Sequence, residues 1–262
     1  MKFLVMTDIE GVTGVTSFEQ AENTDFGKAM LMNDLKAVLK GIKKAGAEAV
    51  VYDMHTDGRN IDITQIEEPV VMGKPILGKK WRGVGGEGFD GLFLMGLHTM
   101  QHTGSLLEHS YLKEYDEISV NGLVVGEIGM EALIAGEQGL PLKFVSGDDM
   151  GCAEGKKLIP ELITCPVKTS LTPDTAVCLA PSVTAKMLEK KAYEAAKANL
   201  KPFKMDGPFE IKIVFGDNRY LKAMKQIHPE LFVNENTIIM KGDNLLETWS
   251  EYLTYEKEMV NL

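Results

Sequence analysis

The sequence predicts an α/β protein: a three-layer sandwich with a mostly parallel sheet, followed by a smaller α+β domain. Over the first 200 residues, short apolar runs typical of buried strands alternate with longer segments of helical periodicity. After residue 200 the pattern becomes strand, helix, strand, helix. We therefore expect a main domain at 1–200 and a smaller unit at 201–262, which begins with a linker at 201–208.

The first elements form a strand–helix–strand unit. Residues 2–7 form a short apolar run, and 26–46 carry apolar residues close to helical spacing, with lysines and Gly46 at the end. A second apolar run, 47–55, follows directly. This order implies two parallel strands joined by a right-handed crossover.

The remaining elements are predicted from the same two patterns, short apolar runs for strands and helical spacing of apolar residues for helices. In the main domain we expect strands at 69–73, 92–98, 142–149 and 165–170, and helices at 127–138, 153–160 and 182–199. Asn121-Gly122 between two apolar runs predicts a tight hairpin. In the smaller unit we expect strands at 209–215 and 236–241 and helices at 217–227 and 242–259.

Composition excludes several classes of protein. The 262 residues carry a net charge of −10 without a basic stripe, which argues against a nucleic-acid partner. No apolar run approaches the ~20 residues that span a bilayer, so we expect no membrane segment. The first apolar run is too short for a signal peptide and acids follow it at once, so we expect a cytoplasmic protein.

Polar side chains follow the predicted strands at the points where the strands end. Asp8 and Glu10 follow the first strand, His55 the second, and His98 a later one. In an open parallel sheet, ligands bind outside the carboxyl ends of the strands, so these side chains should share one crevice. Glu127 begins a helix just after the hairpin and is placed to reach the same crevice.

This combination of residue types predicts a metal site. Imidazole and carboxylate ligands suit Zn²⁺ well, and Mn²⁺ or Fe²⁺ less specifically. Five ligands exceed the needs of one tetrahedral zinc that keeps a water, but they suit two metals bridged by a carboxylate. Asp8 and Glu10 point to the same face of an extended segment, and Asp8 is the expected bridge.

Each residue also has a purely structural alternative. Asp8 and Glu10 could cap the following segment, His55 could form a surface pair with Asp53, and His98 could be a lone core histidine. The scarcity of histidine favours a shared site, because four of the five histidines lie between residues 55 and 109.

Three further features are weighed in the same way. We interpret His102 as a loop residue, either near the site or simply exposed, while His109 could return to the site and transfer protons. The spacing of the glycine-rich stretch 82–88 fits neither the dinucleotide-binding fingerprint nor the P-loop, so this stretch is expected to be a loop. Asp148 and Asp149 are expected to cap the next helix rather than line the crevice.

Taken together, the motifs resemble the zinc-dependent D-aminopeptidase family. The matching segments are DIEG at 8–11, YDMH at 52–55, GLH at 96–98, EHS at 108–110 and NGLVVGEIG at 121–129. The resemblance implies two zinc ions held by Asp8, Glu10, His55, His98 and Glu127. It also implies that His109 is the catalytic histidine.

The resemblance further implies hydrolysis of short peptides from the amino end, favouring D-residues. It implies a homo-oligomer as well, with a decameric ring as the form known in the family. Met54, Leu97 and His102 depart from the family's pattern, and we expect these departures to affect substrate choice.

Other functions stay open at the level of sequence. A two-metal site could act on L- or β-peptides or on a phosphate ester, although we expect no arginine beside these motifs to bind a phosphate. The domain could also bind peptides without cleaving them.

Overall fold

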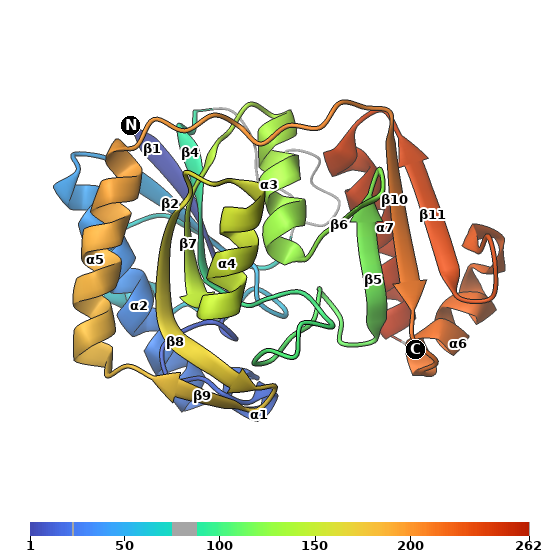
Figure 1. The fold of residues 1–262 in the computed structure, drawn as a ribbon, viewed down its shortest axis with the longest axis horizontal. Helices are drawn as coiled ribbons and strands as arrows, with labels where there is room; N and C mark the ends of the chain where they lie inside the picture. The colour runs from blue at the N-terminus through green and yellow to red at the C-terminus, as the bar shows by residue number, and fades with distance from the viewer. Residues whose placement is uncertain (23, 75–87, 262) are drawn as a thin grey trace.

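A computed structural model describes residues 1–22, 24–74 and 88–261. Its centre is a seven-stranded sheet with the order β3-β2-β1-β4-β7-β8-β9 (Figure 1). The strands are β1 (Lys2–Thr7), β2 (Glu48–Asp53), β3 (Val70–Val71), β4 (Gly91–Leu97), β7 (Leu142–Asp148), β8 (Ile163–Thr172) and β9 (Thr175–Cys178). Every pairing is parallel except that of β9 with β8, so the mostly parallel sheet is confirmed.

Helices cover both faces of this sheet, which gives three layers (Figure 1). One face carries α2 (Asp25–Lys44) and α5 (Pro181–Lys197), and the other carries α3 (Glu127–Glu137) and α4 (Asp149–Leu158). Strand β1 serves both layers because alternate side chains of a strand point to opposite faces. Phe3 and Val5 pack into the cluster with α2 and α5, while Leu4 and Met6 pack into the cluster with α3.

A smaller antiparallel sheet has the order β11-β10-β5-β6. It consists of β5 (Tyr115–Val120), β6 (Leu123–Val124), β10 (Phe209–Phe215) and β11 (Thr237–Gly242), and α6 (Arg219–Ile227) and α7 (Leu245–Val260) accompany it. The predicted turn is present, with φ of 47° at Asn121 and 81° at Gly122. This hairpin pairs with β10, so the small sheet draws strands from both sides of residue 200, and the division into 1–200 and 201–262 stays a prediction.

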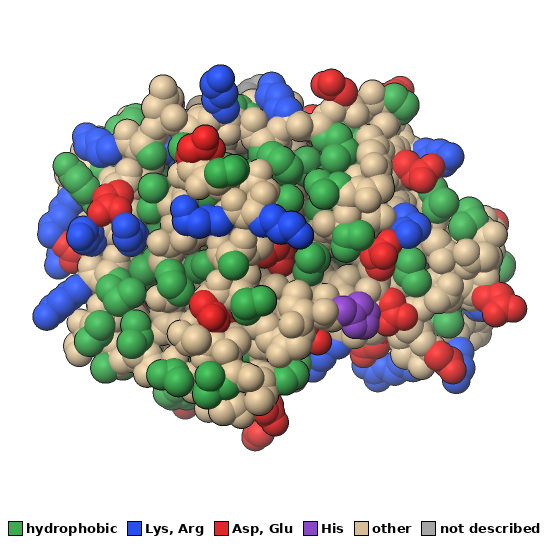
Figure 2. All heavy atoms as spheres, in the orientation of Figure 1, with side chains coloured by type: hydrophobic (Ala, Val, Ile, Leu, Met, Phe, Trp, Pro, Cys, Tyr) green, Lys and Arg blue, Asp and Glu red, His purple; other side chains and the backbone are tan. Residues whose placement is uncertain are grey.

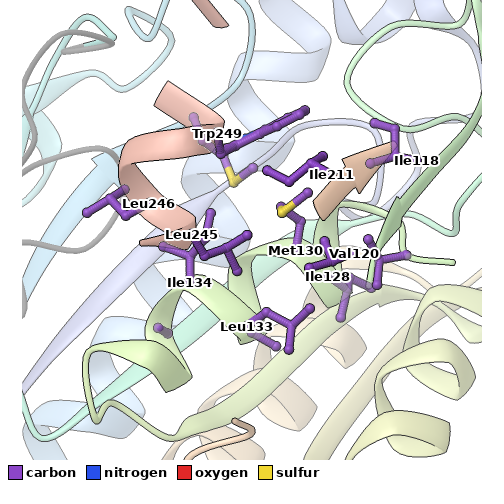
Figure 3. Packing of buried hydrophobic residues seen from close by; sticks show 14 of the residues in the cluster. Ile118, Val120, Ile128, Met130, Leu133, Ile134, Ile211, Leu245, Leu246 and Trp249 are labelled. Atoms are coloured by element: carbon purple, nitrogen blue, oxygen red, sulfur yellow. The ribbon is translucent and has the colours of Figure 1, made fainter. Parts of the chain in front are cut away.

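Helix α3 joins the two sheets. Its apolar residues, among them Ile128, Met130, Leu133 and Ile134, are fully buried or nearly so. Figure 3 shows Met130 beside Ile211 of β10 and Trp249 of α7, and Ile128 beside Val120 of β5. The start of α3 is therefore held firmly between the large sheet and the small one.

The sequence located most of these elements within a few residues. Several short elements of the described residues were missed. They are β9, which is largely exposed and has no apolar alternation, the four-residue helix α1 (Phe18–Ala21), and the 3-10 helices Ile63–Gln65 and Pro229–Leu231. Helix α4 begins at Asp149, earlier than expected, because Asp148 caps it by accepting a hydrogen bond from Gly151 N at 2.7 Å.

Two sequence predictions concern the remaining parts of the chain. Residues 82–87 of the glycine-rich stretch lie outside the described residues. Within the described ranges, no helix is both long and apolar enough to cross a membrane.

Candidate metal centre

The predicted site residues meet at the carboxyl ends of the central strands. The chain passes from β1 to β2 on one side and later places β4 on the other side, so β1 lies where the strand order reverses. Such a switch point leaves a crevice at the strand ends. Asp8 directly follows β1, His98 directly follows β4, and His55 lies two residues beyond β2.

Three carboxylates and two imidazoles form one buried cluster. His55 Nδ1 lies 2.9 Å from Asp8 Oδ1 and 2.9 Å from Glu10 Oε2. His98 Nε2 lies 3.3 Å from Glu127 Oε1 and 3.5 Å from Asp8 Oδ2. All five side chains are buried, and Asp8 contacts both imidazoles.

Close backbone packing places the two acids. The segment after β1 is attached to the end of β4 by hydrogen bonds from Asp8 N to Met95 O and from Gly11 N to Gly96 O. At Gly11, a Cβ would lie 1.9 Å from the carbonyl oxygen of Leu97. Only glycine fits there, which gives the glycine of the DIEG motif a structural reason.

The electrostatics of the cluster reflect crowded negative charge. Burial and the charge of Glu10 raise the pKa of Asp8 to about 7. Burial disfavours the charged forms of the other groups, but the ion pairs outweigh it. The carboxylates raise the pKa of His55 to about 11 and of His98 to about 10, while the imidazoles lower the pKa of Glu127 to about 2 and that of Glu10 well below its usual range.

The donor set fits divalent metal ions. Each imidazole turns one buried ring nitrogen toward two carboxylate oxygens: His55 Nδ1 toward Asp8 and Glu10, and His98 Nε2 toward Asp8 and Glu127. Nitrogen and carboxylate donors that converge in this way can share a divalent cation. His98 Nδ1 lies 3.0 Å from the carbonyl of Thr99, which can only accept, so Nδ1 carries a proton and Nε2 is the ring nitrogen placed to bind a metal. Ligand atoms of Asp8, Glu10 and His98 all lie within 4.8 Å of one another.

His109 lies against this cluster. Its ring stacks on that of His98 with the centroids 4.0 Å apart, and the ring of Phe18 contacts it edge-on. His109 Nδ1 lies 2.9 Å from the carbonyl of Leu107, so Nδ1 is the donor and Nε2 is left as a base. His98, His109 and Glu127 also form a group whose ligand atoms lie within 4.8 Å, so the geometry admits His109 as a ligand as well.

Asp53 and His102 take no part in the contacts between imidazoles and carboxylates of the cluster. Asp53 does not pair with the His55 ring; its carboxylate instead binds backbone N–H groups of the following loop, at His55, Asn60 and Ile61. His102 is exposed, with a side-chain exposure of 70%, and its Nε2 lies 3.8 Å from Asp116 Oδ1. It lies apart from the buried cluster.

A cavity of about 750 Å³ opens beside the cluster. Asp8, Glu10, His55, His109 and Glu127 all line it. Of the three departures from the family's pattern, Met54 lines the cavity, whereas Leu97 is fully buried and outside the lining.

Several lining residues were not predicted. Arg219 and Tyr220 of α6, and Leu253, Glu256 and Lys257 of α7, come from the C-terminal unit. They lie on ordinary amphipathic helices far along the chain, so no local signal marks them. Glu131 is different: it follows Glu127 by four residues on α3, a spacing that places both on one face of a helix.

The cavity also contains basic side chains. Arg59 and Arg219 are among its lining residues. The expectation that no arginine sits beside the motifs to bind a phosphate is wrong, because Arg59 and Arg219 both line the cavity. Arg59 lies four residues beyond His55, and Arg219 reaches the cavity only through the fold.

Comparison with known proteins identifies the family of this chain. Residues 1–252 match the family model Peptidase_M55, described as D-aminopeptidase. The D-aminopeptidase of Bacillus subtilis (strain 168) is 26% identical over 213 residues, which cover 77% of each protein. A solved structure described as "Zn-dependent D-aminopeptidase DppA from Bacillus subtilis, a self-compartmentalizing protease" shares the fold, with a TM-score of 0.88, 22% identity and coverage of 100% of this chain and 99% of that one. The predicted resemblance is confirmed: the chain belongs to the D-aminopeptidase family Peptidase_M55.

Proposed function

We propose that this protein is a zinc-dependent aminopeptidase that releases residues from the amino end of short peptides and favours D-amino acids. The observation that carries the proposal is the buried cluster of three carboxylates and two imidazoles beside a cavity. Membership of the family supports the reaction, and the description of DppA as Zn-dependent supports the metal.

Two zinc ions per subunit are the proposed complement. The ligands are Asp8, Glu10, His55, His98 and Glu127, with Asp8 shared because it contacts both imidazoles. When bound, such a metal pair polarises a scissile carbonyl and lowers the pKa of a water toward neutrality.

His109 is the proposed proton-transfer group. The Leu107 carbonyl fixes its Nδ1 as the donor, and stacking on His98 fixes the plane of the ring. Nε2 is then oriented to accept a proton and return it to the leaving amine. A direct nucleophilic role would use the same nitrogen.

The remaining lining of the cavity suits a short zwitterionic peptide. Acidic side chains such as Glu131 and Glu256 can attract the ammonium group of the substrate, and Arg59, Arg219 and Lys257 can attract its carboxylate. Met54, which lines the cavity next to His55, is placed to affect the choice of side chain.

The decisive assay measures release of D-Ala from D-Ala-D-Ala by protein stripped of metal and then resupplied with zinc. L-Ala-L-Ala is the matched substrate, and a His55→Ala variant is the matched protein. Zinc-dependent cleavage of the D-peptide alone supports the whole proposal. Cleavage of the L-peptide as well would still support an aminopeptidase but would reject the proposed preference for D-amino acids.

A phosphate ester is the second candidate, since Arg59 and Arg219 line the cavity. Zinc-dependent hydrolysis of p-nitrophenyl phosphate without peptide cleavage would favour a phosphate-ester hydrolase over an aminopeptidase. Tight peptide binding without cleavage in zinc-replete protein would favour a binding module.

A homo-oligomer, with a decameric ring as the specific form, is also proposed. DppA is described as self-compartmentalizing, and exposed apolar side chains gather near β8, β9 and the start of α5 in the present chain (Figure 2). These include Leu171, Val177, Leu179 and Val183. Light scattering coupled to size exclusion measures the subunit number, and a monomer would reject the ring. Cytoplasmic location stays a prediction.

A further inference from the structure

Lys168 is a buried lysine whose ammonium group donates three hydrogen bonds to the backbone of the segment after β1. It lies on β8 with an exposure of 2%. Its Nζ donates to Glu10 O at 2.6 Å, to Val12 O at 3.0 Å and to Val15 O. An ammonium group has three donors, so each can serve one of these carbonyls.

The bonded segment carries two of the proposed ligands. The carbonyl of Glu10 is held directly, while Gly11 N and Asp8 N are held by β4. On the far side, Thr13 N and its hydroxyl donate to the Asp34 carboxylate of α2 at 2.8 and 2.9 Å. The segment after β1 is thus bonded to β4 through Asp8 and Gly11 and to α2 through Thr13. Lys168 adds its bonds to β8.

The charge of Lys168 also faces acidic groups. Asp148 is its register partner on β7, and Asp34 and Glu10 are the other acids that act on it. An uncharged side chain would leave three carbonyls without this donor and would remove a positive charge from beneath the acidic cluster.

We propose that Lys168 is a positioning residue for the metal centre: it fixes the backbone from Glu10 to Val15 and thereby the directions of the Asp8 and Glu10 carboxylates. The inference rests on the proposed ligand set. Lys168 does not line the cavity, so its effect on substrate should be indirect.

The test is the zinc affinity of Lys168→Met, measured by competition with a chromogenic chelator. The chain offers a matched control in Lys143→Met, which removes another buried lysine, from the start of the neighbouring strand β7. Lys143 Nζ donates to Ala196 O at 3.3 Å, away from the cluster. Both variants should unfold at lower temperature than the wild type.

We expect Lys168→Met to weaken zinc binding about tenfold or more, the effect usual for groups that orient metal ligands. Lys143→Met should keep the wild-type affinity within about twofold. At saturating zinc, Lys168→Met should lower kcat with little change in KM, because the cavity lining is intact. Wild-type zinc affinity in folded Lys168→Met would overturn the inference.

A second variant covers the case in which Lys168→Met does not fold. Lys168→Arg keeps the charge, but its planar guanidinium cannot direct three donors to the same carbonyls, so zinc affinity should again fall. Unchanged affinity in Lys168→Arg would then overturn the inference.

The outcomes for this inference and for the proposed function are distinct. If the wild type binds zinc but cleaves no peptide, the proposed function is rejected. The comparison of zinc affinities then still tests the role of Lys168. If the wild type binds no zinc, both fail.

Discussion

At the scale of single residues, the surroundings of a histidine determine its chemistry. His98 and His109 stack on one another, yet carboxylates raise the pKa of His98 to about 10, whereas burial and the charge of His98 lower that of His109 to about 4. Without a bound metal, the ring of His98 is therefore protonated near pH 7, whereas the ring of His109 is neutral and keeps an unprotonated Nε2.

Replacing His109 with alanine should therefore separate turnover from metal binding. We expect kcat to fall by about 10²–10⁴, the usual contribution of general acid–base catalysis, with zinc content unchanged. Metal analysis of the purified variant beside a peptide assay checks this. Loss of zinc together with activity would show that His109 is a ligand, a role that the geometry also admits.

Gly11→Ala tests the close packing that places the acids. The new Cβ would lie 1.9 Å from Leu97 O, so the segment after β1 must shift. We expect a loss of about 1–3 kcal/mol in the free energy of unfolding and weaker zinc binding.

Gly46→Ala is the matched control for Gly11→Ala. Gly46 has a φ of +74°, but a Cβ at this position would meet nothing within 4 Å, so alanine there should cost stability and leave zinc affinity unchanged. Equal zinc affinities in the two variants would contradict the explanation.

At the scale of elements, the turn of the β5–β6 hairpin is attached to the start of β10. Asn121 adopts a φ of 47°, a conformation that asparagine tolerates well. Its side chain donates to Pro208 O at 3.1 Å and accepts from Glu210 N at 2.7 Å. One residue therefore forms the turn and also ties it to the segment that leads into β10.

Asn121→Ala should lower the free energy of unfolding by about 1–3 kcal/mol, because it removes these bonds and introduces backbone strain. Urea denaturation measures the change. Asn234→Ala, at an exposed site with one local bond, should stay within about 0.5 kcal/mol of wild type. Similar losses in both variants would argue against the linking role of Asn121.

At the scale of the whole molecule, the cavity is built from elements of both sheets. The acidic cluster comes from the ends of large-sheet strands and from the start of α3, while α6 and α7, which accompany the small sheet, supply another part of the lining. Because α3 packs against both sheets, the position of Glu127 depends on how the two sheets pack together.

Zinc binding should consequently stabilise the entire fold. A ligand that binds only the folded state adds about 2.7 kcal/mol at a free concentration 100 times its Kd. Thermal unfolding should shift upward when zinc is added to stripped protein, and this shift should be smaller in Asp8→Asn. Identical melting curves with and without zinc would contradict a structural contribution from the metal.

The sequence by itself determined the order of the elements and the positions of the site residues along the chain. Apolar periodicity is a local property, so it located β1, β4 and α3 closely, and it placed Asp8, His98 and Glu127 at their ends. Parallel pairing then predicted that those ends meet, because adjacent parallel strands end at the same edge of a sheet.

Only the tertiary structure decided which distant groups join them. Local periodicity carries no information on contacts between residues far apart in the chain, so it could not show that the hairpin pairs with β10 or that Arg219 lines the cavity. Nor could it show that Lys168 reaches the carbonyl of Glu10, a contact across 158 positions of the chain. Such contacts depend on how whole layers pack, and packing is settled by the shape and burial of many side chains together.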